Sequence, residues 1–421
     1  MFSVLSSAWA LLLGMMLLQV GNGMQGTLLG VRGQMEGFST LEMSLVMSGY
    51  FLGFLFGSRM APEMIRRVGH VRVFAALASM ISAVMILYPA FANPWAWGVG
   101  RVLIGFCFSG VYVTAESWLN NAATNDNRGK ALSLYMIVQM VGIVSAQALM
   151  LTADPGGFVL FIIPSVLISL SFAPILLSIS PTPAFDTTKP MTLREIMKIS
   201  PLGCVGMFLL GGVFAAQFGM AAVYGAEAGL SVGQISTFVA TFYVGAMLVQ
   251  YPLGWLSDRM DRRLLILIAA AISALGAVIG MALGSVFWLL LVAAFLVGGM
   301  SNPLYSLLIA YTNDFLGSDD MAAAAGGMVF INGLGAVFGP IITGWIMGVV
   351  GPSGYFLHIA TLCTMMAAYA AYRMTQRAAP SAEETERYTA VMPNASPMAV
   401  TYAQEVAMEA AEENAEDGQA A

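Results

Sequence analysis

The chain has 421 residues, of which 58% are hydrophobic and only 10% are charged. Soluble domains carry about 25% charged residues, so this sequence has too few of them to cover a water-facing surface. The formal net charge of -6 is uneven, because residues 380–421 hold nine acids and one arginine. No basic patch with interleaved aromatic residues occurs, so the sequence gives no indication of a nucleic-acid partner.

Apolar runs long enough to cross a bilayer recur along the chain. A hydrocarbon core about 30 Å thick needs about 20 apolar residues per helix, and unpaired backbone groups in lipid require that these spans be helical. The first run lacks a basic region before it and is longer than the apolar part of a signal peptide, so we expect it to remain as a span. Twelve transmembrane helices are predicted, at 6–30, 43–62, 73–91, 97–122, 130–152, 158–180, 201–223, 232–256, 264–284, 287–311, 322–349 and 353–374.

The distribution of Lys and Arg predicts the orientation of these spans. Cytoplasmic loops carry an excess of positive charge. With the N-terminus inside, fifteen basic residues fall in inner loops or the tail, only Arg32 falls in an outer loop, and Arg101 lies within a span. We therefore expect an integral, multi-pass protein with both termini in the cytoplasm.

The chain divides into two groups of six spans at a polar, proline-containing inner loop. We expect an N-terminal six-helix bundle over 1–180, a cytoplasmic linker over 181–200, a second six-helix bundle over 201–374, and a disordered acidic cytoplasmic tail over 375–421. Transient helix is expected near 401–415. A constant offset of 193 residues pairs Tyr50 with Tyr243, Arg66 with Arg259, Gly105 with Gly298, Tyr112 with Tyr305, and Asn120 with Asn313. This pattern indicates duplication of a six-helix unit, and an even number of spans makes the two repeats parallel.

Several local motifs add to the pattern of spans. GWLSDRMDRR at 254–263 resembles the inner-loop signature of the major facilitator superfamily, with Asp261 where glycine is usual. Span four carries Arg101 and Gly105 at the family's spacing, and NDNRGKALSLY at 125–135 resembles the family's entry to helix five. AESWLN and RVGHVRVFA resemble a largely uncharacterised bacterial branch, the YcaD-like transporters. The resemblance covers roughly residues 5–375 and implies an all-α membrane protein with twelve helices in two parallel six-helix repeats.

The same resemblance implies roles for residues at the inner face. In this family, inner-loop residues latch the two halves together in the outward-open state. The inner-gate candidates carried over in this way are Arg67, Arg72, Asp258, Arg259 and Arg263. Ordinary solvated loop charge is the alternative for them.

Two charged residues stand within the spans, away from their ends. Arg101 and Glu116 are fifteen residues apart, about 22 Å along a helix, so they cannot pair with each other. They share one helical face with Gly105, Ser109 and Tyr112. Intramembrane charges are costly and usually paired or facing water. Both residues are therefore proton-coupling candidates. Arg101 also has an anionic substrate group or a structural partner as alternatives, and Glu116 an inner-face salt bridge or helix-end bond.

Amides and phenols near the middle of the spans complete the expected translocation path. Such groups can orient a solute by hydrogen bonds, although membrane helices also use them to hold one another. The resemblance implies that helices one, four, seven and ten line the central cavity. The substrate-path candidates are Asn22, Gln25, Arg101, Tyr112, Gln147, Gln217, Tyr243, Asn302, Tyr305 and Asn332.

Several classes of function are weighed against these residues. We expect a secondary active transporter that moves a small organic solute across the bacterial inner membrane, with proton coupling and as a monomer in the lipid bilayer. A multidrug-type efflux pump is one alternative, weakened because helix five has no proline. A sensor or scaffold acting through the acidic tail is another. No catalytic motif, metal-ligand spacing or cofactor motif points to an enzyme, so neither a metal nor a cofactor is expected.

Overall fold

The computed structural model describes residues 2–122, 128–177, 191–376 and 388–407. Helix is the only regular structure in these ranges. The elements, in chain order, are α1 (Phe2–Met35), α2 (Thr40–Val68), α3 (His70–Ala90), α4 (Pro94–Ala122), α5 (Arg128–Leu149), α6 (Val159–Ser171), α7 (Ala173–Leu177), α8 (Leu193–Ile199), α9 (Pro201–Ala215), the π-helix η2 (Ala216–Met220), α10 (Ala221–Glu227), α11 (Val232–Ser257), α12 (Arg262–Leu283), α13 (Phe287–Asn313), α14 (Ser318–Val350) and α15 (Gly354–Gln376).

Eleven helical segments in the described ranges are long and apolar enough to cross a membrane. They correspond to the second to twelfth predicted spans, with α6 and α7 joined in one segment and α9, η2 and α10 in another. Helix α1, 34 residues long, lies where the first span was predicted. The count of twelve stays a prediction.

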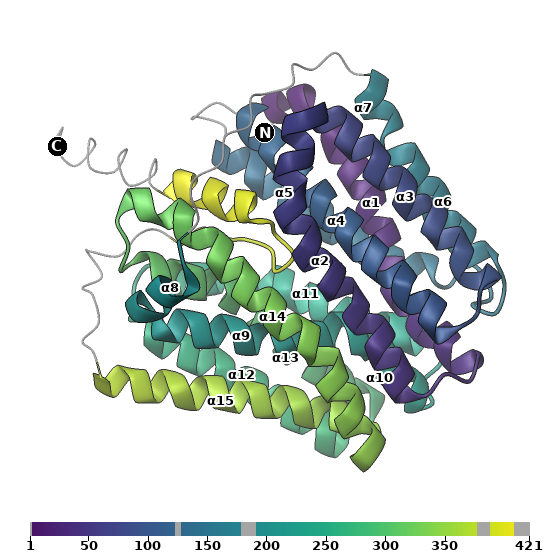
Figure 1. Cartoon of the computed structure of the whole chain (residues 1–421). Coiled ribbons are helices and arrows are strands. Elements are labelled where there is room, and N and C mark those ends of the chain that lie inside the picture. The colour runs from purple at the N-terminus through teal and green to yellow at the C-terminus, as the bar shows by residue number, and fades with distance from the viewer. Residues whose placement is uncertain (1, 123–127, 178–190, 377–387, 408–421) are drawn as a thin grey trace.

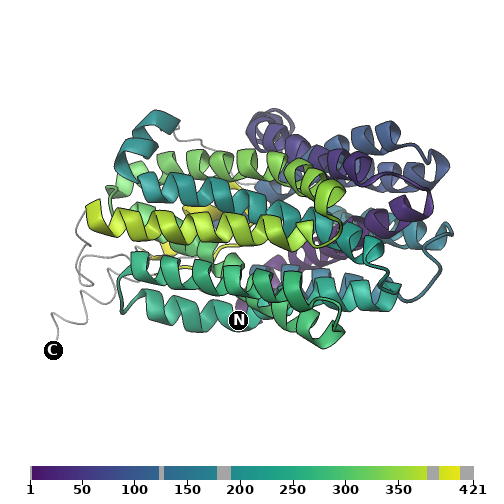
Figure 2. The ribbon, with the colours of Figure 1, turned by 90° about the horizontal axis from the view of Figure 1, so that it is seen from below.

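The helices form two bundles that lie side by side (Figures 1 and 2). Equivalent pairs pack together in each bundle. Helix α2 packs on α4 as α11 packs on α13, α1 on α5 as α9 on α14, and α3 on α6 as α12 on α15. The two bundles are called below the first half (α1–α7) and the second half (α9–α15).

Glycines allow the closest of these helix pairs to touch along their backbones. Gly49, Gly53 and Gly57 recur every four residues on α2, a spacing that predicts a close-packing face. A Cβ on Gly53 would collide with the carbonyl oxygen of Val102 on α4. In return, a Cβ on Gly105 would collide with the carbonyl oxygen of Tyr50 on α2. The helix-packing role predicted from the glycine spacing on α2 is thereby confirmed.

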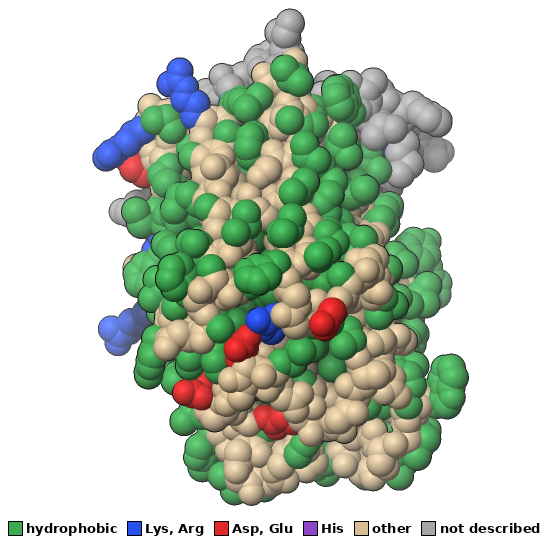
Figure 3. Space-filling view, turned by 90° about the vertical axis from the view of Figure 1, so that its right-hand side faces the viewer, with side chains coloured by type: hydrophobic (Ala, Val, Ile, Leu, Met, Phe, Trp, Pro, Cys, Tyr) green, Lys and Arg blue, Asp and Glu red, His purple; other side chains and the backbone are tan. Residues whose placement is uncertain are grey.

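The outer surface of the bundles suits a bilayer. Large apolar side chains such as Phe56, Trp95, Trp288 and Trp345 are half or more exposed. Figure 3 shows one flank on which hydrophobic and uncharged surface predominates, with few charged side chains. Exposure of so much apolar surface is typical of lipid contact rather than water contact.

The linker and the tail both contain structure. Within the expected linker 181–200, α8 begins with a capping box in which Thr192 and Glu195 exchange hydrogen bonds. The tail was expected to be disordered. Residues 388–407 instead pack between the two halves and are helical over 397–407 (yellow in Figure 1). Residues 377–387 and 408–421 of that tail lie outside the described residues.

Candidate functional site

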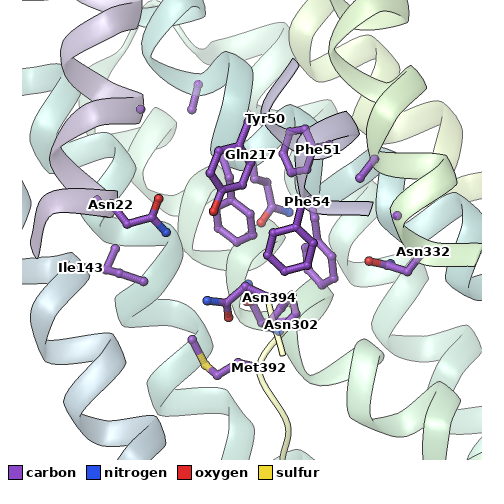
Figure 4. A pocket seen from close by; sticks show the side chains of 18 of the residues that line it. Asn22, Tyr50, Phe51, Phe54, Ile143, Gln217, Asn302, Asn332, Met392 and Asn394 are labelled. Carbon is purple, nitrogen blue, oxygen red and sulfur yellow. The ribbon is translucent and has the colours of Figure 1, made fainter. Parts of the chain in front are cut away.

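A central pocket lies between the two halves (Figure 4). Asn22 on α1 and Asn332 on α14 reach it from opposite sides, and Met392 and Asn394 of the tail lie below it. The cavity has a volume of about 120 Å³. Its principal lining side chains are Asn22, Thr27, Tyr50, Phe51, Phe54, Ser58, Arg101, Ile143, Phe214, Gln217, Phe218, Val239, Tyr243, Asn302, Val329, Asn332, Met392, Pro393 and Asn394.

Six of the ten substrate-path candidates line this pocket. They are Asn22, Arg101, Gln217, Tyr243, Asn302 and Asn332. The other four lie behind the lining, where they join helices to one another or pack in the bundle: Gln25, Tyr112, Gln147 and Tyr305.

Tyr112 belongs to a hydrogen-bonded network between α1, α4 and α5. Its hydroxyl donates to Gln19 Oε1 at 2.8 Å and accepts from Asn22 Nδ2 at 2.9 Å. Gln19 also donates to Gln139 Oε1 at 2.6 Å. Because Asn22 lines the pocket and its amide is held by Tyr112, this network orients one polar group of the site.

Gln147 serves a similar structural purpose at another level of α1. It accepts from the Thr27 hydroxyl at 3.0 Å and donates to the carbonyl oxygen of Gly23 at 3.1 Å. Gln25 donates to Asn22 Oδ1 at 3.1 Å. Tyr305 is fully buried, and its hydroxyl has no partner among the described residues.

Arg101 is the one basic side chain among the described residues of the pocket lining. It is 3% exposed, and its Cζ lies 4.8 Å from the centroid of the Tyr50 ring. Its Nε has no hydrogen-bond partner in the part of the chain that the structure describes. A buried guanidinium with an unused donor at a pocket wall is available to a ligand that brings an acceptor.

An irregular turn presents Gln217 to the pocket. The π-helix η2 interrupts the span formed by α9 and α10, and such bulges are frequent at functional sites. Gln217 Nε2 donates to the Ser301 hydroxyl at 2.8 Å, whereas its buried Oε1 has no partner among the described residues. The site therefore offers an unused amide acceptor from this turn.

Aromatic rings form much of the apolar wall. Phe218 stacks on Tyr243 at a centroid distance of 5.3 Å, and Phe214 stacks on Phe218 at 5.7 Å. Tyr50, Phe51 and Phe54 follow one another on the facing surface of α2. Flat rings of this kind bind apolar or planar parts of a solute.

The remaining second-half amides are held by backbone carbonyl groups. Asn302 donates to the carbonyl oxygen of Gly298 at 2.9 Å, within α13. Asn332 donates to that of Met207 at 3.0 Å and so joins α14 to α9. Each amide keeps hydrogen-bonding capacity for a ligand.

The pocket contains no acidic side chain in its described lining. Its polar groups are one guanidinium, several amides, hydroxyls and phenols. This set matches neutral or anionic polar groups better than cations, because no carboxylate offsets a positive charge. The described residues contain no group of three or more His, Cys, Asp and Glu placed to bind a metal ion.

At one end of the pocket the two halves touch each other. This end, called the far end, is where α1 ends and α2 begins. Gly30 on α1 lies against Ala222 on α10, and the Thr40 hydroxyl hydrogen-bonds to Glu227. Farther along the interface, the Ser48 hydroxyl donates to the carbonyl oxygen of Val337 at 2.5 Å.

At the opposite end, called the tail end, residues 388–407 lie between the halves. Here the Glu116 carboxylate accepts from the Ser396 backbone N–H at 3.0 Å and from the Ser396 hydroxyl. Tyr135 also donates to Glu116, at 3.2 Å. Glu116 is 1% exposed, so the second charged residue of α4 is buried against the tail.

The inner-gate candidates form contacts within one half or with the tail. Arg67 pairs with Glu63 at 2.6 Å and Arg263 with Asp261 at 2.8 Å. Arg259 lies over the Trp255 ring, with its Cζ 4.2 Å from the centroid.

The other two candidates lie nearby. Asp258 accepts from the Tyr388 backbone N–H at 2.7 Å, and Arg72 is exposed. In this conformation, none of these contacts joins one half directly to the other.

Sequence reasoning missed the tail and most of the aromatic wall. The sequence did contain an indication for Tyr50, because the offset of 193 residues pairs it with Tyr243. The tail also had one: residues 388–404 contain no charged side chain, although acids flank them on both sides. Such a composition is typical of a buried segment rather than a solvated one.

Comparisons with known proteins identify relatives of this chain in sequence and in fold. The sequence profile of the Major Facilitator Superfamily matches residues 11–224 and 202–399. Uncharacterised MFS-type transporters named YcaD from Salmonella arizonae and Escherichia fergusonii are each 24% identical over 356 residues, covering 84% of this chain and 92% of the relative.

Solved transporter structures share the fold. The nucleoside transporter NupG superposes with a TM-score of 0.72 at 14% identity, over 86% of this chain and 98% of that one. A bacterial homologue of the human lysosomal transporter Spinster, in an inward-facing and occupied conformation, has a TM-score of 0.67 at 16% identity, covering 88% and 96% of the two chains. Proteins of this family are transporters rather than enzymes. The profile match spans both halves, and the chain therefore belongs to the major facilitator superfamily of membrane transporters.

Proposed function

We propose that this chain is a secondary active transporter that carries a small organic solute across the bacterial inner membrane by alternating access. The single observation that carries the proposal is the pocket between the halves, which combines Arg101 and several amides with an aromatic wall. Sites placed between two repeats near the middle of the membrane are typical of secondary transporters. Twelve spans in two parallel repeats and a monomeric transport unit belong to the same proposal.

The orientation follows from the charge distribution. The tail end of the pocket faces the cytoplasm in this proposal, because basic residues concentrate in the loops at that end. The far end, where the halves touch, then faces outward. The conformation is accordingly one with its outer side closed.

The pocket lining supports a neutral or anionic substrate. A cation would have to approach Arg101 with no acidic side chain in the described lining to offset the repulsion. This chemistry disfavours the efflux of apolar cations. The NupG neighbour transports nucleosides, which are neutral polar ring compounds, but at 14% identity it supports the fold alone.

A ligand screen tests the proposal directly. The purified protein is melted in the presence of small carboxylates, phosphates, nucleosides and apolar cations. A ligand at about 100 times its dissociation constant stabilises by about 2.7 kcal/mol, which registers as a higher melting temperature. We expect neutral or anionic hits, with the anionic hits lost in Arg101→Ala and retained in Arg194→Ala, an exposed arginine on α8. Hits confined to apolar cations would contradict the substrate class.

Proton coupling is proposed for Glu116. It is the one acidic side chain in the described interior of α4, and carboxylates inside membranes are typical of proton relays. In proteoliposomes, we expect Glu116→Gln to lose solute accumulation driven by a pH gradient but to keep exchange of labelled for unlabelled solute. Equal loss of both would assign Glu116 to binding or folding instead.

A further inference from the structure

The tail end of the pocket is occupied by a segment of the chain itself. Residues 388–407, called here the tail plug, run from a point beside the pocket to a helix between the halves (Figure 1). Much of the plug is buried: Val400, Ser396 and Tyr402 have no exposed surface. Met392, Pro393 and Asn394 form part of the pocket wall itself.

The plug binds the first half through side chains of α4 and α5. Ser396 donates to Glu116 by its N–H and its hydroxyl, which are bonds to a charged acceptor and hence stronger than neutral ones. Glu405 pairs with Arg128 at 3.2 Å, and the Tyr402 hydroxyl donates to the carbonyl oxygen of Arg128 at 2.8 Å.

The plug binds the second half with a separate set of contacts. The Tyr388 N–H donates to Asp258 at 2.7 Å, and Gln250 donates to the Tyr388 hydroxyl at 2.9 Å. The Val391 N–H donates to the Ser306 hydroxyl at 2.8 Å. Farther along, Gln404 donates to Asn313 Oδ1 at 3.1 Å.

A gap in the helical wall makes room for the plug. A Cβ on Gly254 would lie 2.6 Å from the Tyr388 ring, so the absence of a side chain there admits the phenol. The plug thus has specific polar partners on both halves, an apolar seat and a charge-free sequence over 388–404. These are the properties of a docked ligand rather than of a solvated tail.

We infer that residues 388–407 are an intramolecular plug that closes the pocket from the tail end and has to leave before solute can pass through that end. The inference rests on the proposed transport function. The far end is closed by the halves themselves, so in this state both routes out of the pocket are obstructed. Because the plug touches both halves, it also holds them at one separation, and its release frees their relative movement.

A thiol-labelling experiment on the full-length chain tests docking without any substrate. Val400→Cys places a thiol where the structure has no exposed surface, and the three native cysteines are buried. A membrane-impermeant maleimide should label this cysteine slowly in detergent solution. Adding Ser396→Asp sets a carboxylate against Glu116, and we expect labelling to accelerate by about tenfold or more, equivalent to about 1.4 kcal/mol of docking free energy.

Three further variants make the result specific. Ser353→Asp makes the same change at an exposed serine beside α15 and should leave the labelling rate unchanged. Glu116→Gln combined with Ser396→Asp removes the like-charge contact and should slow labelling again. Tyr388→Ala releases the plug through its contacts with the second half and should accelerate labelling even if the Ser396→Asp variant folds poorly.

Closure of the pocket has its own reporter. Val329→Cys lies in the pocket lining on α14. In inside-out vesicles, we expect the impermeant reagent to reach it faster when Ser396→Asp or Tyr388→Ala is present. Rapid labelling of Val400→Cys in the otherwise unchanged chain overturns docking, and equal labelling of Val329→Cys with and without the release variants overturns closure. Both outcomes are independent of whether any solute is transported, so they are distinguishable from failure of the proposed function.

Discussion

The guanidinium of Arg101 lies over the ring of Tyr50, with 4.8 Å between Cζ and the ring centroid. A desolvated cation–π contact contributes about 2 kcal/mol, whereas a charge at mid-helix in a membrane costs at least about 2.5 kcal/mol. The contact with Tyr50 and the cost of burying the charge are thus of similar size, so Arg101 adds little net stability. A buried charge that adds little stability points to a role in the site.

Arg101→Met should consequently leave the ligand-free protein as stable as before, or more stable. The apolar side chain keeps much of the volume and removes the buried charge. We expect an unchanged or higher melting temperature together with loss of the response to anionic ligands. Arg101→Lys, which keeps charge but not the planar donor set, should retain part of that response. A clear drop in melting temperature for Arg101→Met would show that the arginine is structural.

Gly105→Ala should destabilise the first half. The added methyl group would collide with the carbonyl oxygen of Tyr50, and neither backbone can move without separating α2 from α4. Overpacking of this kind costs about 1–3 kcal/mol or more. Gly98→Ala on the same helix is the matched control, because nothing lies within 4 Å of its added Cβ. We expect a lower melting temperature for the first variant and no decrease for the second, and equal behaviour would refute backbone contact at Gly105.

Asp261 replaces the glycine usual in the family's loop signature and caps α12. Its carboxylate accepts from the Arg263 N–H at 2.9 Å and pairs with the Arg263 guanidinium at 2.8 Å. Partial burial raises the pKa of Asp261, but the hydrogen bonds from Arg263 outweigh it and hold the pKa below its usual value.

Asp261→Ala should therefore lower stability by about 1 kcal/mol at neutral pH, the usual cost of losing a cap. A depressed carboxyl pKa stabilises the fold above the unfolded-state value near about 3.9, and this contribution disappears as the pH falls through the folded-state value. The difference in melting temperature between the two chains should thus shrink on acidification from pH ~7 to pH ~3. Asp261→Asn, which can still accept the Arg263 N–H, should lie between them. If the difference in melting temperature does not change with pH, the charge of Asp261 does not contribute to the stability.

The helices of the fold could be predicted from the sequence. Each span must hydrogen-bond its own backbone groups in lipid, so a local apolar run is enough to locate it. It also identified Arg101, Gln217 and Asn332, whose polarity is conspicuous in apolar surroundings. It did not separate Asn22, which lines the pocket, from Tyr112, which holds Asn22 in place. Both are polar residues at similar depth, and only packing decides which one faces the cavity.

The tail plug was missed for a different physical reason. Averaged over 375–421, the composition is acidic and predicts disorder, whereas burial is decided by the shorter charge-free stretch within it. Its partners Glu116, Asp258 and Ser306 are distant in sequence, so no local pattern reports their contact. Glu116 was recognised as unusual from its position in a span, but its nearest donors came from a segment expected to be solvated.

Arg262 and Asp314 form a buried ion pair between the start of α12 and the end of α13. Their side chains are 2% and 1% exposed, and Arg262 also donates to the Ser257 hydroxyl and the carbonyl oxygen of Ala310, both at 3.2 Å. Removing one member of a buried pair usually costs about 3–5 kcal/mol. The cost should be the smaller for Asp314→Leu, because Arg262 keeps the Asp258 carboxylate at 3.9 Å. Arg262→Met and Asp314→Leu should each lower the melting temperature strongly. The double variant should recover a large part of the loss, because replacing a whole buried pair by apolar side chains is often neutral. If the double variant loses as much as the sum of the singles, the two side chains stabilise the loop independently and the pair is not the unit of stability.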